Sequence, residues 1–295
     1  PHRRPSFALF DAIDDRVHVD AHWLEDCAGE VVTFASYDAP AFREYLRAHL
    51  RDILVMESVP LSDRAWAAHR ALLHELAYLF AGASGGRASG LIGAARGLAQ
   101  FLAAHFEPDA LFRSLRVDAP HTPVVHGVES AIGAVALALA DGQRTIARLT
   151  MVACAAAVAD IGLLDLPREV REKPTLSPMD WQAIRRHPDL SRRRLQAMGL
   201  GSPDVQRAVG HHHERWDGTG YPAGLARDAI PVEARYLAIA DTYSALTVAR
   251  RGMPRLSRRE ALREMARSAG QFDPRVLPAL IQLLAGAAPA EHAAA

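Results

Sequence analysis

The stretch 211–222 constrains the fold of this sequence more than any other. It holds three consecutive histidines and a glutamate, followed directly by a turn that contains Gly218 and Gly220. Neighbouring residues of an α-helix point roughly 100 degrees apart, so His212 and His213 can both reach one ion only where a helix ends. Glycine is typical of such helix ends. The stretch therefore predicts two imidazoles that bind one metal ion beside a turn that shapes the site.

Most of the chain after residue 40 has the apolar period of an amphipathic helix. Thr122, Ser177 and Ser202 each precede a proline, which is the pattern of a hydroxyl cap before the first helical residue. Ser177 with Asp180 also resembles a capping box, and Ser62 is a further candidate cap. We expect helices at about 42–54, 62–80, 91–106, 123–140, 144–160, 178–187, 189–198, 203–213, 232–249, 258–268 and 274–284.

The first 35 residues have a different pattern. Short alternating runs at 7–13, 17–23 and 31–34 are bounded by Asp and Gly, which predicts a few short strands. The expected fold class is therefore mostly α. We expect a small mixed α/β amino-terminal domain at 1–115, a helical metal-binding domain at 116–286 and a disordered alanine-rich tail at 287–295.

The overall charge and the cysteine content limit the partners and the compartment. The 34 basic and 34 acidic residues cancel, which disfavours nucleic acid and anionic membrane surfaces as partners. We expect no apolar run of about 18 residues that could span a bilayer. Cys27 and Cys154 are too few for a disulfide framework. These features predict a cytoplasmic protein that binds neither membrane nor nucleic acid.

Six histidines and aspartates, which come from five of the predicted helices, form a candidate metal site. A helical bundle builds such sites from inward-facing side chains, and imidazole with carboxylate but no thiolate favours Fe, Mn or Zn. An aspartate can bridge two ions, and two ions suit the hydrolysis of a phosphodiester. Taken singly, some of the six could instead be a core histidine, a surface carboxylate or a cation at a helix end. The six candidates are His126, Asp160, His187, His212, His213 and Asp241.

Together these motifs resemble the HD-GYP family, a branch of the HD phosphohydrolase superfamily whose active members hydrolyse bacterial cyclic di-GMP. The resemblance covers about 116–285. The motifs that carry it are Asp160-Ile161-Gly162, Lys173-Pro174, His187-Pro188, His212-His213-Glu214, Asp217-Gly218-Thr219-Gly220-Tyr221-Pro222, Ala240-Asp241-Thr242-Tyr243 and Phe272-Asp273-Pro274.

The resemblance implies an HD-type helical bundle with one or two divalent ions, Fe or Mn ahead of Zn. It also implies cyclic di-GMP or a linear dinucleotide as the ligand. Asp160 would be the bridging catalytic carboxylate. One ion would take His126, Asp160 and Asp241, and the other would take Asp160, His187, His212 and His213. The residues expected at the substrate are Gly220, Tyr221, Pro222 and Arg250.

The sequence departs from the family pattern at functional positions. Ala159 stands where the family has the His of its name-giving His-Asp pair, and Leu163 stands where a lysine would neutralise substrate phosphate. The ion expected at His126, Asp160 and Asp241 should therefore bind weakly or not at all. Losing one electrostatic donor typically costs on the order of 10² to 10³ in rate. Further departures are Thr122 for a glutamate of members with three metals, Ser244 for an aspartate, Gly252 for a tyrosine and Met253 for a basic residue.

Two functions follow from this pattern. One is a metal-dependent cyclic di-GMP phosphodiesterase whose activity is weakened by Ala159 and Leu163. The other is a catalytically silent module that binds cyclic di-GMP, or other signalling proteins, without hydrolysis. A homodimer is compatible with both.

Overall fold

The computed structural model describes residues 39–81, 88–105 and 122–285, apart from 172, 174, 201 and 248–254, and the backbone of three short strands. The strands are β1 (Leu9–Asp11), β2 (Arg16–Val19) and β3 (Val32–Phe34). They form an antiparallel sheet in the order β1-β2-β3. A strand thus lies within or beside each of the three segments with alternating sequence.

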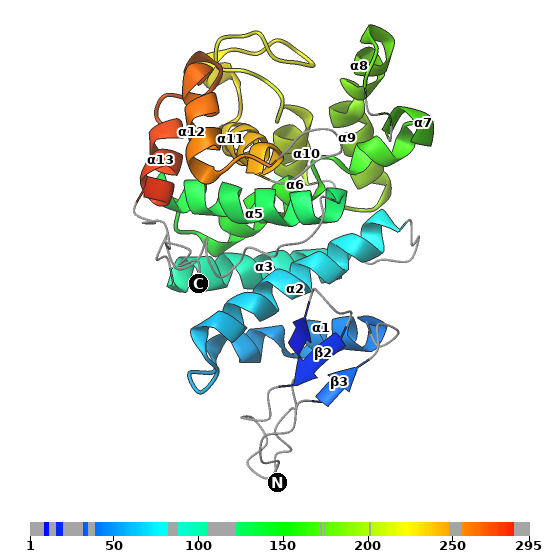
Figure 1. The fold of residues 1–295 in the computed structure, drawn as a ribbon, viewed down its shortest axis with the longest axis vertical. Helices are drawn as coiled ribbons and strands as arrows, with labels where there is room; N and C mark the ends of the chain where they lie inside the picture. The colour runs from blue at the N-terminus through cyan, green and yellow to red at the C-terminus, as the bar shows by residue number, and fades with distance from the viewer. Residues whose placement is uncertain are drawn as a thin grey trace, which may run out of the picture.

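Helices make up most of the described structure (Figure 1). They are α1 (Ala39–Val55), α2 (Leu61–Phe80), α3 (Ala88–Ala104), α5 (Pro123–Ala140), α6 (Ile146–Val158), α7 (Arg168–Arg171), α8 (Pro178–Ile184), α9 (His187–Ala197), α10 (Pro203–Gly210), α11 (Val232–Thr247), α12 (Arg258–Arg267) and α13 (Leu277–Ala285), with the short 3-10 helices η3 (Ile161–Asp165), η4 (Arg227–Ala229) and η5 (Ala269–Gln271). The predicted mostly helical fold class is confirmed.

The three hydroxyl caps before proline are confirmed. The hydroxyl of Thr122 accepts a hydrogen bond from the N–H of Val125 at 3.1 Å. Ser177 forms its predicted capping box, and Ser202 caps α10. The predicted cap at Ser62 is wrong. Helix α2 begins at Leu61 and its first turn bonds to the carbonyl of Pro60 instead.

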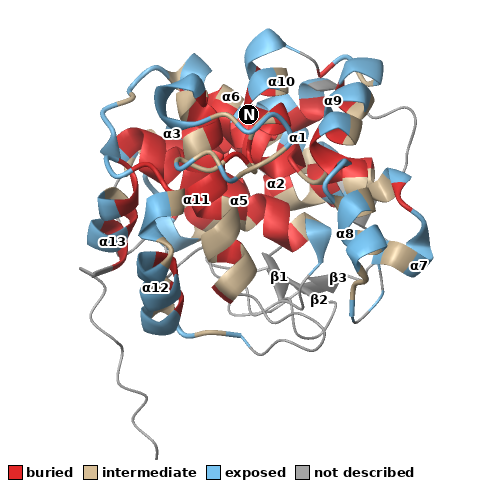
Figure 2. Ribbon diagram, turned by 90° about the horizontal axis from the view of Figure 1, so that it is seen from above, coloured by how far each residue is buried: buried red, intermediate tan, exposed pale blue. Residues whose placement is uncertain are grey.

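Helix α5 lies at the centre of the helical core, against α6 and α11 (Figure 2). Its buried residues run almost without interruption from Val125 to Leu139. Two segments, Pro123–Ala140 and Ile146–Asp165, have the length and mean hydropathy of a membrane span, so the expectation that no such run exists was wrong. Most of each segment is buried inside the protein. Burial of these two segments in the hydrophobic core explains why their sequences are apolar.

The amino-terminal helices share this core. Helix α2 packs against α5, and α3 packs against α6. One continuous buried cluster includes Phe42 of α1, Leu98 of α3, Val135 of α5 and Leu284 of α13. A separate small mixed domain at 1–115 is therefore not supported, because the helices of 39–104 bury their apolar faces against the later helices. The predicted boundary near 115 and the tail at 287–295 lie outside the described residues.

Candidate metal centre

The structure brings all six predicted ligands together. They form two groups that share Asp160, and the candidate ligand atoms within each group lie within 4.8 Å of one another. Ligands on opposite sides of one ion lie at most about 4.4 Å apart, since each bond is about 2.0 to 2.2 Å long. Both groups are thus close to the size of a metal site. One group is Asp160, His187, His212 and His213, and the other is His126, Asp160 and Asp241.

The ends of elements present most of these side chains. Asp160 lies between α6 and η3, and His187 begins α9. His212 and His213 follow the end of α10 at Gly210. The adjacent histidines therefore lie in one group just after the end of a helix, which is where the sequence analysis expects them. His126 and Asp241 instead come from within α5 and α11.

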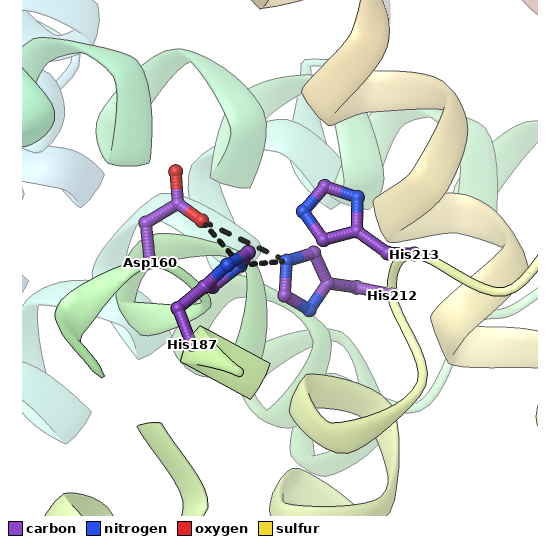
Figure 3. Close-up of side chains that lie close together, drawn as sticks. All are labelled: Asp160, His187, His212 and His213. Atoms are coloured by element: carbon purple, nitrogen blue, oxygen red, sulfur yellow. Dashed lines mark hydrogen bonds and ion pairs between the residues drawn. The ribbon is translucent and has the colours of Figure 1, made fainter. Parts of the chain in front are cut away.

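We call the group with three imidazoles the histidine group. Its rings and carboxylate face one another (Figure 3). The Nε2 atom of His187 lies 3.1 Å from Oδ1 of Asp160 and 3.2 Å from Nε2 of His212. The His213 ring lies beside both other rings, with centroids 4.1 Å from His212 and 4.9 Å from His187. Four donor atoms from three parts of the chain therefore surround one point.

Hydrogen bonds fix the ring nitrogens that face this point. The Nδ1 atom of His187 lies 2.8 Å from the Ile184 carbonyl, and Nδ1 of His212 lies 2.6 Å from the Val209 carbonyl. Because a carbonyl only accepts, both Nδ1 atoms donate, so if the rings are neutral the two Nε2 lone pairs face each other. Such a pair needs a positive charge between its members. With Asp160 and His213 alongside, the donor set fits a divalent ion such as Fe, Mn or Zn.

The charges of the group also suit metal binding. Burial opposes the ionisation of Asp160, but the hydrogen bonds of His187 and His212 and the charges of His187 and His126 lower its pKa well below the ordinary value. Burial, together with the neighbouring His212, lowers the pKa of His213 well below its ordinary value. Asp160 is therefore a carboxylate and His213 a neutral imidazole at neutral pH. These are the forms in which the two residues bind metals.

We call the second set of three residues the carboxylate group. The Nε2 atom of His126 lies 2.7 Å from Oδ1 of Asp241 and 3.6 Å from Oδ2 of Asp160. The two oxygens of Asp160 thus face different groups, as a bridging carboxylate requires. This group supplies one nitrogen and two carboxylates, because the adjacent Ala159 has no donor. It therefore offers one candidate donor fewer than the histidine group.

Ser244 orients the histidine of the carboxylate group. Its hydroxyl lies 2.9 Å from Nδ1 of His126, and the serine is 1 % exposed. When Nδ1 donates this hydrogen bond, Nε2 is left to face the two aspartates. Ser244 lies three residues after Asp241, on the same side of α11. The departure from the family aspartate therefore retains a hydrogen-bonding side chain.

Ser191 and Gly162 hold the turn that carries Asp160. The Ser191 hydroxyl donates to the Ala159 carbonyl at 2.6 Å and accepts from the Gly162 N–H at 2.8 Å. A Cβ atom on Gly162 would lie 2.3 Å from the Ser191 nitrogen and 2.5 Å from the His187 carbonyl oxygen. Only a glycine lets the turn pack this closely against α9. This contact places Asp160 beside His187.

Replacing Gly162 by alanine is expected to separate η3 from α9 and to impair metal binding. Overpacking of this kind costs about 1 to 3 kcal/mol, and each kcal/mol lowers the Tm of a domain this size by about 2 to 4 °C. Thermal unfolding and elemental analysis measure the two effects. Gly93→Ala is the matched control, since a Cβ atom there meets nothing within 4 Å. A Gly162→Ala protein with unchanged Tm and metal content would refute this role for Gly162.

The predicted glycine turn contacts the histidine group through Tyr221. The Tyr221 ring stacks on His213, with centroids 4.8 Å apart and planes at 28°. The buried carboxylate of Glu214 holds the turn by accepting from the N–H groups of Ala223 and Leu225 at 2.7 and 3.0 Å. A Cβ atom on Gly220 would lie 2.3 Å from the Arg215 nitrogen, so this position also requires glycine.

The other residues singled out in the sequence either lie outside the described structure or are engaged elsewhere. Arg250, Gly252 and Met253 lie outside the described residues. Lys173, the one lysine of the sequence, pairs with Asp180 at 2.6 Å at the start of α8. Thr122 uses its hydroxyl as the α5 cap. Sequence reasoning missed Ser191, because no motif links a serine to residues about thirty positions earlier in the chain.

Comparison with known proteins identifies the family of the region that carries the candidate metal centre. A family model described as an HD domain matches residues 121–276. The cyclic di-GMP phosphodiesterase PA4108 of Pseudomonas aeruginosa is 40 % identical over 124 residues, which are 42 % of this chain and 30 % of that protein. The 3'3'-cGAMP-specific phosphodiesterase 1 of Vibrio cholerae is 40 % identical over 128 residues, again 42 % of this chain and 30 % of the relative. The matched region thus spans about a third of these relatives.

A solved structure shares the fold over nearly the whole chain. Bd1817, an HDG"Y"P protein from Bdellovibrio bacteriovorus, superposes with a TM-score of 0.68 at 18 % identity. The match covers 97 % of this chain and 96 % of Bd1817. The similarity therefore includes the amino-terminal helices as well as the helices that carry the metal centre.

Proposed function

This chain belongs to the HD domain family, in its HD-GYP branch, and we propose that it is a metal-dependent phosphodiesterase that hydrolyses a cyclic dinucleotide. The observation that carries the proposal is the pair of ligand groups joined by Asp160, one oxygen toward each group. Relatives named for hydrolysis of cyclic di-GMP and of 3'3'-cGAMP support the substrate class. Between these, we propose cyclic di-GMP, with Fe or Mn as the resident metal.

A divalent ion held at the histidine group, with a second ion held weakly at the carboxylate group, would activate water and stabilise the phosphate oxygens during displacement. The residues of the chain supply the geometry for this chemistry. Asp160 sets the spacing of the two groups, and the backbone carbonyls of Ile184 and Val209 orient the imidazoles of His187 and His212. Tyr221 covers one face of His213.

We expect the reaction to be slow. Leu163, which is partly exposed on η3, has an uncharged side chain in place of the family lysine. Lys173 is held by Asp180 in an ion pair. The reacting phosphate therefore lacks a charge that would be worth on the order of 10² to 10³ in rate. The same loss supports a second candidate function, a module that binds a cyclic dinucleotide without hydrolysis.

A turnover assay separates the two candidates. Protein purified without oxygen and loaded with Fe or Mn is incubated with cyclic di-GMP, the linear dinucleotide and bis(p-nitrophenyl) phosphate. We expect slow, metal-dependent release of products, abolished by a chelator. Absence of turnover on all three substrates would reject the hydrolase proposal. Binding of cyclic di-GMP in calorimetry would then support the silent module.

A further inference from the structure

Beside the metal centre, α8 presents an aromatic and a cationic side chain on one face. Trp181 and Arg185 are four residues apart, and the N–H of Arg185 donates to the Trp181 carbonyl at 2.9 Å, so the helical spacing extends to Arg185. Residues with this spacing are neighbours on a helix surface. Helix α8 protrudes next to α7 and α9 (Figure 1). We call Trp181 and Arg185 the α8 face.

The ring of Tyr221 connects Arg185 of the α8 face to the histidine group. The Arg185 guanidinium carbon lies 5.4 Å from the centroid of the Tyr221 ring. Tyr221 in turn stacks on His213. Arg185 is thus separated from a predicted metal ligand by a single aromatic ring. Its position in the chain differs from that of Leu163, which replaces the family lysine.

Arg185 is available to bind a ligand. Its side chain is exposed and forms no ion pair with any residue that the structure describes. Two other arginines of this region are paired: Arg192 with Asp189 at 3.3 Å, and Arg194 with Asp165 at 2.8 Å. A guanidinium over an aromatic ring keeps its N–H edges free, and these edges match the oxygens of a phosphate.

Trp181 offers a flat surface to the solvent. Its side chain is 52 % exposed, and it is the one aromatic among the exposed large hydrophobic residues of the described chain. The bases of a nucleotide stack on such surfaces, and each stacked base contributes substantially to binding. A phosphate-binding arginine and an exposed indole on one helix face therefore form the two parts of a nucleotide-binding surface.

We propose that the α8 face binds the half of the cyclic dinucleotide that is remote from the reacting phosphate. Arg185 donates to the second phosphate, and Trp181 stacks on a base. The inference rests on the proposed function, because it takes the reacting phosphate to lie between the two ligand groups. It assigns affinity and substrate selectivity to α8, while the bond-breaking chemistry stays with the metal ligands.

The test measures affinity and turnover separately on the metal-loaded full chain. In calorimetric titrations with cyclic di-GMP, Arg185→Gln and Trp181→Ala are each expected to weaken binding on the order of tenfold. The adjacent Arg186 is also exposed, so Arg186→Gln is the matched control and should bind within about twofold of the wild type. Hydrolysis of bis(p-nitrophenyl) phosphate, which has one phosphate and no base, should be equal in all four proteins.

The possible results separate the inference from the proposed function. Unchanged affinity in both α8 variants, or no binding of cyclic di-GMP by the wild type, overturns the inference. Wild-type turnover of bis(p-nitrophenyl) phosphate would still support the hydrolase. An equal loss of affinity in Arg186→Gln also overturns the inference, because the effect would then reflect charge alone. Selective loss in the α8 variants supports the α8 face even if the wild type hydrolyses nothing.

Discussion

Replacing Asp160 by asparagine is expected to abolish hydrolysis and to remove the bound metal. Asp160 is the one residue common to both ligand groups. Its Oδ1 atom lies 3.1 Å from Nε2 of His187, and its Oδ2 atom lies 3.6 Å from Nε2 of His126. Asparagine keeps the shape but presents a neutral oxygen and an N–H₂ donor, which faces one group and cannot bind a cation. We expect turnover to fall by about 10³ or more and metal affinity by more than about 100-fold.

The control for Asp160→Asn is Asp189→Asn. Asp189 is an aspartate of the neighbouring helix α9 whose exposed side chain pairs with Arg192 at the surface. Exposed pairs of this kind contribute about 0 to 1 kcal/mol, so this variant should keep its metal and its activity. Turnover in Asp160→Asn within a few fold of the wild type, at equal metal loading, would show that the carboxylate does not bridge the site.

Restoring the two missing family residues is expected to raise activity. The double variant Ala159→His with Leu163→Lys adds an imidazole next to Asp160 and a cation on η3. The imidazole would give the carboxylate group a second nitrogen, and the lysine would place charge near the reacting phosphate. We expect a gain on the order of 10² to 10³ in turnover of cyclic di-GMP, with an increase in bound metal.

The two single variants and a displaced lysine test the origin of that gain. The single variants show whether the two effects add or depend on each other. Leu164→Lys is the positional control, because Leu164 packs against the buried core whereas Leu163 is outside that cluster. A gain in Leu164→Lys equal to that in Leu163→Lys would indicate a general charge effect. No gain in the double variant would show that the pocket has changed beyond these two positions.

The candidate ligands could be predicted from the sequence because local signals identify them. Adjacent histidines before a glycine turn can share an ion only at a helix end, and α10 does end at Gly210. An aspartate in the apolar stretch of α11 needs a partner when buried, and Asp241 finds it in His126 at 2.7 Å. The hydroxyl caps at Thr122, Ser177 and Ser202 are local in the same sense, since each bonds within three residues.

The features that the sequence did not reveal depend on tertiary contacts. The Ser191 hydroxyl joins Ala159 and Gly162 across 32 and 29 residues, and no periodicity predicts such a pairing. A separate amino-terminal domain is not supported, because the apolar faces of α2 and α3 find their partners in α5 and α6, and no local pattern in the sequence predicts that packing. The α8 face was missed because an exposed tryptophan and arginine acquire meaning only when the position of Tyr221 is known.

The number of metal ions per chain tests the central claim most directly. Elemental analysis of wild-type protein purified without oxygen and supplied with Fe or Mn should find about one ion per chain, held by the histidine group with its three imidazoles and a carboxylate. The same analysis of Asp160→Asn should find almost none. Wild-type protein without metal, or an Asp160→Asn protein with as much metal as the wild type, would contradict the account.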